Sequence, residues 1–251
     1  MRKAATKVKH TGRTEIRVGD ALKAMKALLV DPEDTAQVFR IIEALSGKNA
    51  LRNAERMARS ESGRRLLRER PDLLARLVDR ASLEALPQDS LGRAYLRFLD
   101  AEGITVEGLY QASIDGRGVE DYELPPDVEF FRNRMRDTHD LWHVVTGYQG
   151  DIIGEAALLA FSFAQVRNLG VGLIASVAFV RGPSSELRRE ILHGFARGQS
   201  ACWLPAVAWE DLLPLPLHEV RARLRVGAPR TYRPVRAKDW TARVRPERAA
   251  A

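Results

Sequence analysis

The chain has very little cysteine, since Cys202 is the only one among its 251 residues. A single cysteine cannot form an internal disulfide, and it excludes a metal site built from several thiolates. The count fits a reducing compartment. Histidine is also scarce, with five in the whole chain, so a pair of histidines close together in the sequence is informative.

The sequence also lacks a long uninterrupted apolar run. Its most apolar region, residues 156–180, is broken by Gln165, Arg167 and Asn168, and its uncharged pieces fall short of the roughly 20 residues that a membrane span requires. No apolar segment follows the basic N-terminus, so a secretory signal peptide is not indicated. We expect a flexible basic arm at residues 1–15 and a flexible tail at residues 238–251.

Acidic residues are outnumbered by basic ones, which gives a net charge of +7 and an isoelectric point of about 9.8. Arginine supplies most of the excess, and it is spread along the chain. No basic run is interleaved with aromatic residues as a groove for single-stranded nucleic acid requires, so we expect no nucleic-acid partner. The charge fits a solvated surface, and it also fits attraction to an anionic membrane.

Apolar residues recur at helical spacing along nearly the whole chain. The clearest stripes and helical segments lie at residues 22–29, 38–45, 66–78, 91–99, 154–168, 170–181, 185–203 and 217–225. Residues 104–128 are expected to form a loop that leads into one helix from Phe130 to about Gly147. Since no segment alternates as a strand would, the predicted fold is all-α, with a single compact helical domain over residues 16–237.

One stretch has the residues and the spacing of a metal site: HDLWHVVTGYQGDIIGE, from His139 to Glu155. Each residue of a helix turns by about 100°, so His139, Asp140 and His143 leave a helix from one arc. Three glycines before Glu155 allow tight turns, so Glu155 can begin a second helix and point back. Two imidazoles and two carboxylates can then hold one divalent ion between two helices. Ordinary surface or capping histidines remain the alternative.

The same stretch reads HDxxH, eleven residues, then E, and it resembles the signature of the Coq4 family of ubiquinone biosynthesis proteins. Residues 62–71, 86–103 and 209–226 also resemble segments of that family, in the family's order. The resemblance covers about residues 18–235. It implies a helical fold and a divalent metal, usually described as zinc, bound by His139, Asp140, His143 and Glu155. The donor set would also accept manganese, iron or cobalt.

The resemblance implies an enzyme that replaces the C1 carboxylate of a polyprenylated hydroxybenzoate ring with a hydroxyl, in a metal-dependent oxidative decarboxylation. The alternative is a non-catalytic, lipid-binding scaffold of the quinone-biosynthesis complex, with a structural metal. The implied partners are a prenylated quinone precursor or other lipid, a membrane surface, other quinone-biosynthesis proteins and a second copy of the chain. The expected location is cytoplasmic, at the inner face of the membrane, or the mitochondrial matrix side in a eukaryote.

Apolar residues after the motif are candidates for a pocket that holds a prenyl tail beside the ion. They are Leu158, Leu159, Phe161, Phe163, Val166, Leu173, Ile174 and Val177. Ordinary core packing produces the same pattern, so the two interpretations stay open.

Two further patterns have simpler explanations. Residues 170–175 fit the dinucleotide pattern G-x-G-x-x-A, but no βαβ unit precedes them, so they indicate a close helix crossing. His139 and Asp140 alone would also suit an HD-type phosphohydrolase. That class normally needs another upstream histidine, and only His10, in the expected arm, is available.

Overall fold

The computed structural model describes residues 15–31, 34–105, 108, 124–182, 184–229 and 231–236. In these residues the chain forms fourteen α-helices and one short 3-10 helix, and the only β pairing is an isolated bridge between Ser90 and Pro216. The all-α prediction is confirmed. No described helix has the length and apolar character needed to cross a membrane. The predicted tail, and the predicted arm except Glu15, lie outside the described residues.

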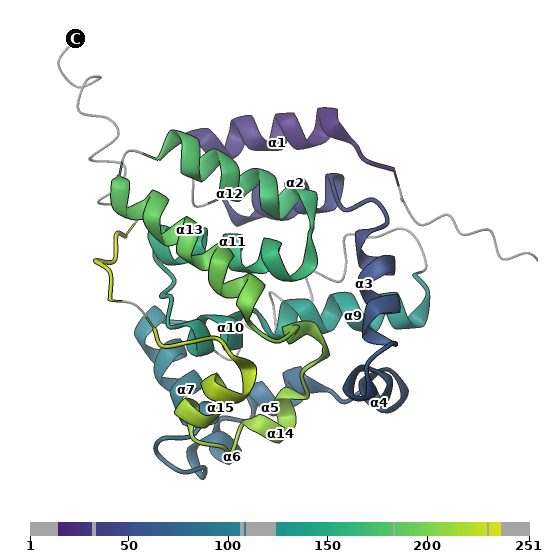
Figure 1. The fold of residues 1–251 in the computed structure, drawn as a ribbon, viewed down its shortest axis with the longest axis vertical. Coiled ribbons are helices and arrows are strands. Elements are labelled where there is room, and N and C mark those ends of the chain that lie inside the picture. Colours follow the sequence, from purple (N-terminus) through teal and green to yellow (C-terminus); the bar gives the residue numbers. More distant parts are fainter. Residues whose placement is uncertain are drawn as a thin grey trace, which may run out of the picture.

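The helices are stacked from one end of the molecule to the other (Figure 1). At the top lie α1 (Val18–Val30), α2 (Thr35–Ala44) and α12 (Leu169–Arg181). The middle holds α9 (Pro126–Asp137), α10 (His139–Thr146), α11 (Ile152–Val166) and α13 (Ser185–Ser200), with α3 (Asn49–Met57) and α4 (Glu61–Glu69) at one side. At the bottom lie α5 (Leu73–Val78), α6 (Arg80–Glu84), α7 (Leu91–Glu102), α14 (Trp209–Leu212) and α15 (Leu217–Leu224).

Helix α11 is held against α13 by two glycines spaced one turn apart. A Cβ atom on Gly194 would lie 2.2 Å from the carbonyl oxygen of Ala157, and one on Gly198 would lie 2.5 Å from that of Phe161. Only glycine permits this approach, because any side chain would force the two backbones apart. The close crossing fixes α11, which carries Glu155.

The predicted close crossing at residues 170–175 is confirmed. A Cβ atom on Gly170 would lie 2.5 Å from the Cα of Ile42, so α12 passes directly over α2. The helix predicted at residues 91–99 is also confirmed: the Ser90 hydroxyl caps it by accepting a hydrogen bond from the amide of Arg93, and Gly103, at φ 68°, ends α7.

The prediction of one helix from Phe130 to Gly147 is wrong. Helix α9 begins at Pro126, because proline suits the first turn of a helix, where its missing N–H is not needed. It ends at Asp137, and α10 begins at His139. The hydroxyl of Thr138 donates to the carbonyl of Met135, the acceptor that the amide of His139 would use in an unbroken helix. Residues 126–128 therefore belong to α9 rather than to the predicted loop.

Candidate metal centre

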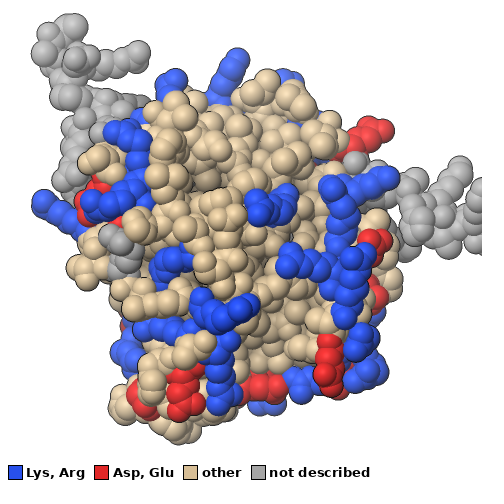
Figure 2. Space-filling view, viewed as in Figure 1, with Lys and Arg blue, Asp and Glu red and all other residues tan. Residues whose placement is uncertain are grey.

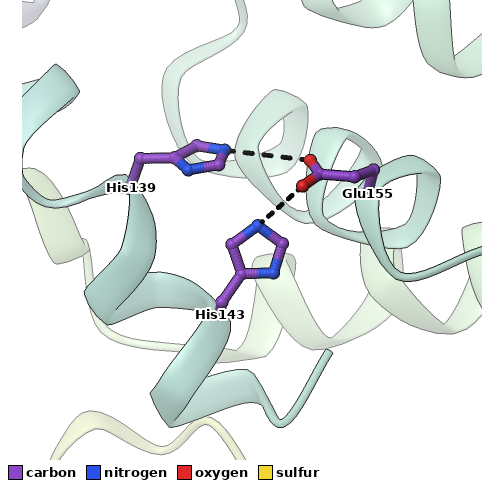
Figure 3. A group of neighbouring side chains, drawn as sticks. All are labelled: His139, His143 and Glu155. Atoms are coloured by element: carbon purple, nitrogen blue, oxygen red, sulfur yellow. Dashed lines mark ion pairs between the residues drawn. The ribbon is translucent and has the colours of Figure 1, made fainter. Parts of the chain in front are cut away.

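Helices α10 and α11 bring three of the four predicted ligands together. One ligand atom each from His139, His143 and Glu155 lies within 4.8 Å of the others. Figure 3 shows both imidazole rings directed at the Glu155 carboxylate: Nε2 of His143 lies 3.2 Å from Oε1, and Nε2 of His139 lies 3.9 Å from Oε2. Gly147, at φ 76°, ends α10 and lets the chain turn back toward α11.

His143 is fixed before any ligand arrives. Its side chain is only 1% exposed, and its Nδ1 lies 3.0 Å from the carbonyl oxygen of Tyr148. A carbonyl can only accept, so Nδ1 donates and Nε2 is turned toward Glu155. The ring of Phe98, on α7, stacks on the imidazole with centroids 5.2 Å apart. The backbone and an aromatic ring thus hold His143 in the orientation that a metal ligand requires.

A positive charge would stabilise the contact between His143 and Glu155. Nε2 of His143 is buried and lacks hydrogen-bond geometry to any described partner, although Oε1 of Glu155 is close. Nε2 of His143 and Oε1 of Glu155 both carry lone pairs, so a proton or a metal cation between them would stabilise this close contact. In a tetrahedral zinc site with bonds of about 2.0 Å, ligand atoms lie about 3.3 Å apart, close to the observed 3.2 Å. These residues therefore fit a divalent ion.

The electrostatics of the group favour a cation as well. Burial alone would raise the pKa of Glu155, but the contact with His143 and the charges of the two imidazoles lower it to about 2. Burial alone would lower the pKa of His139, but Asp140 and Glu155 raise it to about 9. Glu155 is thus ionised at neutral pH, and a metal must displace a proton from His139.

Asp140 lies outside the group of three. Its Oδ1 is 3.1 Å from Nδ1 of His139, so it accepts a hydrogen bond from that ring and turns Nε2 toward Glu155. Carboxylates commonly orient metal-binding histidines in this way. Direct binding of the ion by Asp140 stays a prediction.

Sequence reasoning missed a segment that holds the turn between the ligand helices, residues 231–236, here termed the C-terminal clasp. The hydroxyl of Tyr232 donates to Oδ2 of Asp151 at 2.5 Å and accepts from the amide of Gln149 at 2.9 Å. Oδ1 of Asp151 accepts from the amides of Ile153 and Val235. Asp151 thereby caps α11 and joins it to the clasp. No periodicity or motif in the sequence marks this contact.

Two arginines hold the other end of α10. Arg221 donates to the carbonyls of Val144 and Val145, and Arg197 donates to that of Thr146. These carbonyls are among the last of α10, which have no partner within the helix, and cations at a helix C-terminus are also favoured by its dipole.

The predicted lipid-pocket residues are divided among three groups of core contacts. Leu158 and Phe161 are at most 1% exposed and belong to the largest cluster, which also contains Trp142. Val166 packs with residues of α3, α4 and α9. Ile174 packs with α1 and α2, as do the partly buried Leu159, Leu173 and Val177, while the ring of Phe163 lies beside that of Phe195. Since these contacts are ordinary core packing, the pocket stays a prediction.

Comparison with known proteins identifies the family. The sequence profile of "Coenzyme Q (ubiquinone) biosynthesis protein Coq4" matches residues 4–230. The chain belongs to the Coq4 family. A mitochondrial ubiquinone biosynthesis protein coq4 from Talaromyces stipitatus is 34% identical over 183 residues, 72% of this chain and 61% of that protein. The Penicillium rubens protein of the same name is 32% identical over 233 residues, 90% of this chain and 79% of that protein.

The Clavispora lusitaniae member of the Coq4 family is 30% identical over 224 residues, 86% of this chain and 67% of that protein. The chain thus spans between 61% and 79% of the length of these three relatives. A crystal structure from Nostoc punctiforme, whose name refers to ubiquinone biosynthesis, has the same fold, with a TM-score of 0.60 and 23% identity. The structural match covers 85% of this chain and 100% of the Nostoc punctiforme chain.

Proposed function

We propose that this Coq4 protein uses a divalent metal, held by His139, His143 and Glu155, to replace the C1 carboxylate of a polyprenylated hydroxybenzoate ring with a hydroxyl. The observation that carries the proposal is the one-sided exposure of the group. The side chain of His143 is 1% exposed, whereas those of His139 and Glu155 are 51% and 44% exposed. A site that is anchored on one side and open on the other leaves room for a substrate.

The protein's residues have separate parts in this reaction. Glu155 supplies a full negative charge at neutral pH, since its pKa is about 2. His143, locked by Tyr148 and Phe98, fixes the position of the ion, while Asp140 orients His139 at the exposed edge. When bound, a divalent ion would supply charge stabilisation for the phenolate and carboxylate oxygens as carbon dioxide leaves. One atom of molecular oxygen would enter the new hydroxyl, and a two-electron reductant would reduce the other atom to water as the carboxylate leaves as carbon dioxide.

Elemental analysis of purified protein tests the metal. About one divalent ion per chain is expected, most readily zinc, and His143→Ala should lose most of it. His193→Ala is the matched control, since His193 lies on α13 outside the group. Equal metal content in both variants would contradict the site.

A complementation experiment tests the chemistry. In cells blocked at the C1-carboxylated intermediate, the wild-type protein should restore quinone, while Glu155→Gln should fold normally and let the carboxylated precursor accumulate. Glutamine has nearly the size of glutamate but is a poorer ligand. Full rescue by a folded, metal-free Glu155→Gln protein would favour the non-catalytic scaffold instead.

The partners follow from this reaction. The substrate carries a prenyl tail, so we propose peripheral contact with a membrane surface and with other quinone-biosynthesis proteins that pass the lipid on. The net charge of +7 supports contact with an anionic leaflet. Mass spectrometry of lipids extracted from the purified protein should find prenylated rings, and their absence from metal-loaded protein would contradict the lipid assignment.

A further inference from the structure

A cavity lies far from the metal centre, at the opposite end of α11. Its volume is about 320 Å³, and Ile16, Leu45, Ser46, Gly47, Lys48, Asn49, Arg52, Arg167 and Leu169 line it. The turn before α3 forms one wall and the turn between α11 and α12 forms another. Glu155 and Arg167 are twelve residues apart, so at 1.5 Å per residue the two sites are separated by about 18 Å along α11.

The lining is positively charged and has no compensating acid. Lys48, Arg52 and Arg167 contribute three cations, and none of the nine lining residues is acidic. Within the described part of the chain no carboxylate forms an ion pair with any of the three. Figure 2 shows Lys and Arg side chains gathered on the right of the molecule, where α3 lies in Figure 1. Unpaired cations around a cavity attract an anion.

One of these cations, Arg167, is held in place by aromatic rings. The guanidinium of Arg167 lies 5.7 Å from the ring centroid of Phe163 and 5.6 Å from that of Phe195. Nε of Arg52 donates to the carbonyl of Lys48 at 3.4 Å, so its terminal nitrogens remain for a ligand. Close by, burial and the charge of Arg167 lower the pKa of Arg56, as crowded positive charge would. A site with one cation already positioned loses less entropy when it binds a ligand.

The backbone beside the cavity favours an anion too. Helix α3 has no side-chain cap at Lys48, and the amides of Ala50 and Leu51, in its first turn, donate to no described acceptor. Such amides, with the helix dipole, stabilise negative charge. The remainder of the lining is apolar: Ile16 and Leu169, each about half exposed, form an edge beside the cations.

From the cavity, its three unpaired cations and its apolar edge, we propose that this site binds a phosphate group whose organic part lies against Ile16 and Leu169. Phosphate matches both the arginine donors and the free amides of α3. The phosphate can belong to a soluble ester or to the headgroup of a phospholipid. This site is independent of the ring chemistry proposed for the metal centre.

The test measures binding of inorganic phosphate by calorimetry, and of vesicles by co-sedimentation. The vesicles are phosphatidylcholine alone or phosphatidylcholine mixed with phosphatidylglycerol in equal parts. We expect saturable binding that is at least about tenfold weaker in Lys48→Gln/Arg52→Gln, because two charged donors are lost. Arg64→Gln/Arg76→Gln removes the same charge from exposed positions on α4 and α5 and should bind like the wild type.

The outcomes distinguish a soluble phosphate ester from a phospholipid headgroup, and the cavity from the metal centre. Binding of inorganic phosphate supports a soluble ester, whereas binding of the anionic vesicles alone supports a lipid headgroup. His143→Ala should bind as the wild type does, since the metal centre is not involved. No saturable binding of either probe, or equal weakening by the two charge-removing variants, overturns the proposal. If Lys48→Gln/Arg52→Gln does not fold, as judged by circular dichroism, Arg52→Gln alone replaces it.

Discussion

Replacing Asp140 with asparagine separates its two roles, as a ligand of the metal or as the partner of His139. Asparagine keeps the shape of the side chain but removes its charge. If Asp140 only orients His139, as its 3.1 Å contact indicates, Asp140→Asn should still bind one ion per chain. Loss of such an orienting carboxylate typically weakens metal binding by about 10- to 100-fold. Loss of a ligand would abolish most binding, as in His143→Ala.

The pH dependence of metal affinity tests the raised pKa of His139 independently. The proton on His139 must leave before the ring can bind a metal, so a pKa of about 9 means that wild-type affinity rises with pH until about pH 9. For a pKa of about 9 the apparent affinity should rise by about 50-fold between pH 7 and pH 9, and solvent screening at this half-exposed ring reduces that rise toward tenfold. In Asp140→Asn the pKa falls toward the ordinary value, so the rise should level off nearer pH 7.

The measurement is a competition titration against a chromophoric chelator at several pH values, with the metal held constant. At pH 10, above the pKa of His139 in both proteins, only the loss of orientation should remain. At pH 7 the weaker proton competition in the variant should offset part of that loss. Metal loss in Asp140→Asn as complete as in His143→Ala would refute the orienting role. Wild-type affinity that is constant from pH 7 to pH 9 would refute the raised pKa.

Three further predictions concern stability and positioning. Gly198→Ala should destabilise the protein by about 1–3 kcal/mol in urea denaturation, since its Cβ meets the Phe161 backbone, whereas Gly19→Ala, with nothing within 4 Å, should be neutral or slightly stabilising. Arg134→Met should lower the free energy of unfolding by about 3–5 kcal/mol in the same assay, because it leaves the carboxylate of Glu210 without its partner. Adding Glu210→Leu to that variant should restore part of the lost stability. Tyr232→Phe should weaken metal binding about tenfold with one ion still bound, and unchanged affinity would show that the clasp does not act on the site.

The helices were predictable wherever a strong apolar stripe coincides with a clear stop. The predicted stripe at residues 91–99 lies in α7, which Ser90 caps and Gly103 ends, and the stripe at residues 66–78 is divided at Pro71 into α4 and α5. The break at Thr138 was not predictable from periodicity, because a helix can continue through threonine and only a side-chain hydrogen bond to Met135 marks the change. Helix α3 was missed because most of its residues are polar, with Ala54 and Met57 as its buried apolar residues.

The candidate site was predictable only where it depends on local geometry. The spacing of His139, His143 and Glu155 depends on helical geometry and a short turn, both of which are local properties of the chain. The supporting contacts are not local. Phe98 and Tyr232 come from parts of the sequence far from the motif, so only the folded structure places them at the site.

For the metal centre that we propose, the C-terminal clasp would set the order of maturation. Its contacts with Asp151 join residues 81 and 84 positions apart in the sequence. During synthesis the chain emerges from its N-terminus, so both ligand helices can form and pack before Tyr232 and Val235 are available. A nascent chain would therefore carry all three ligands on an unsecured turn and hold metal weakly. Tight metal retention would begin only once the clasp has docked, so metal loading would be a late, largely post-translational event.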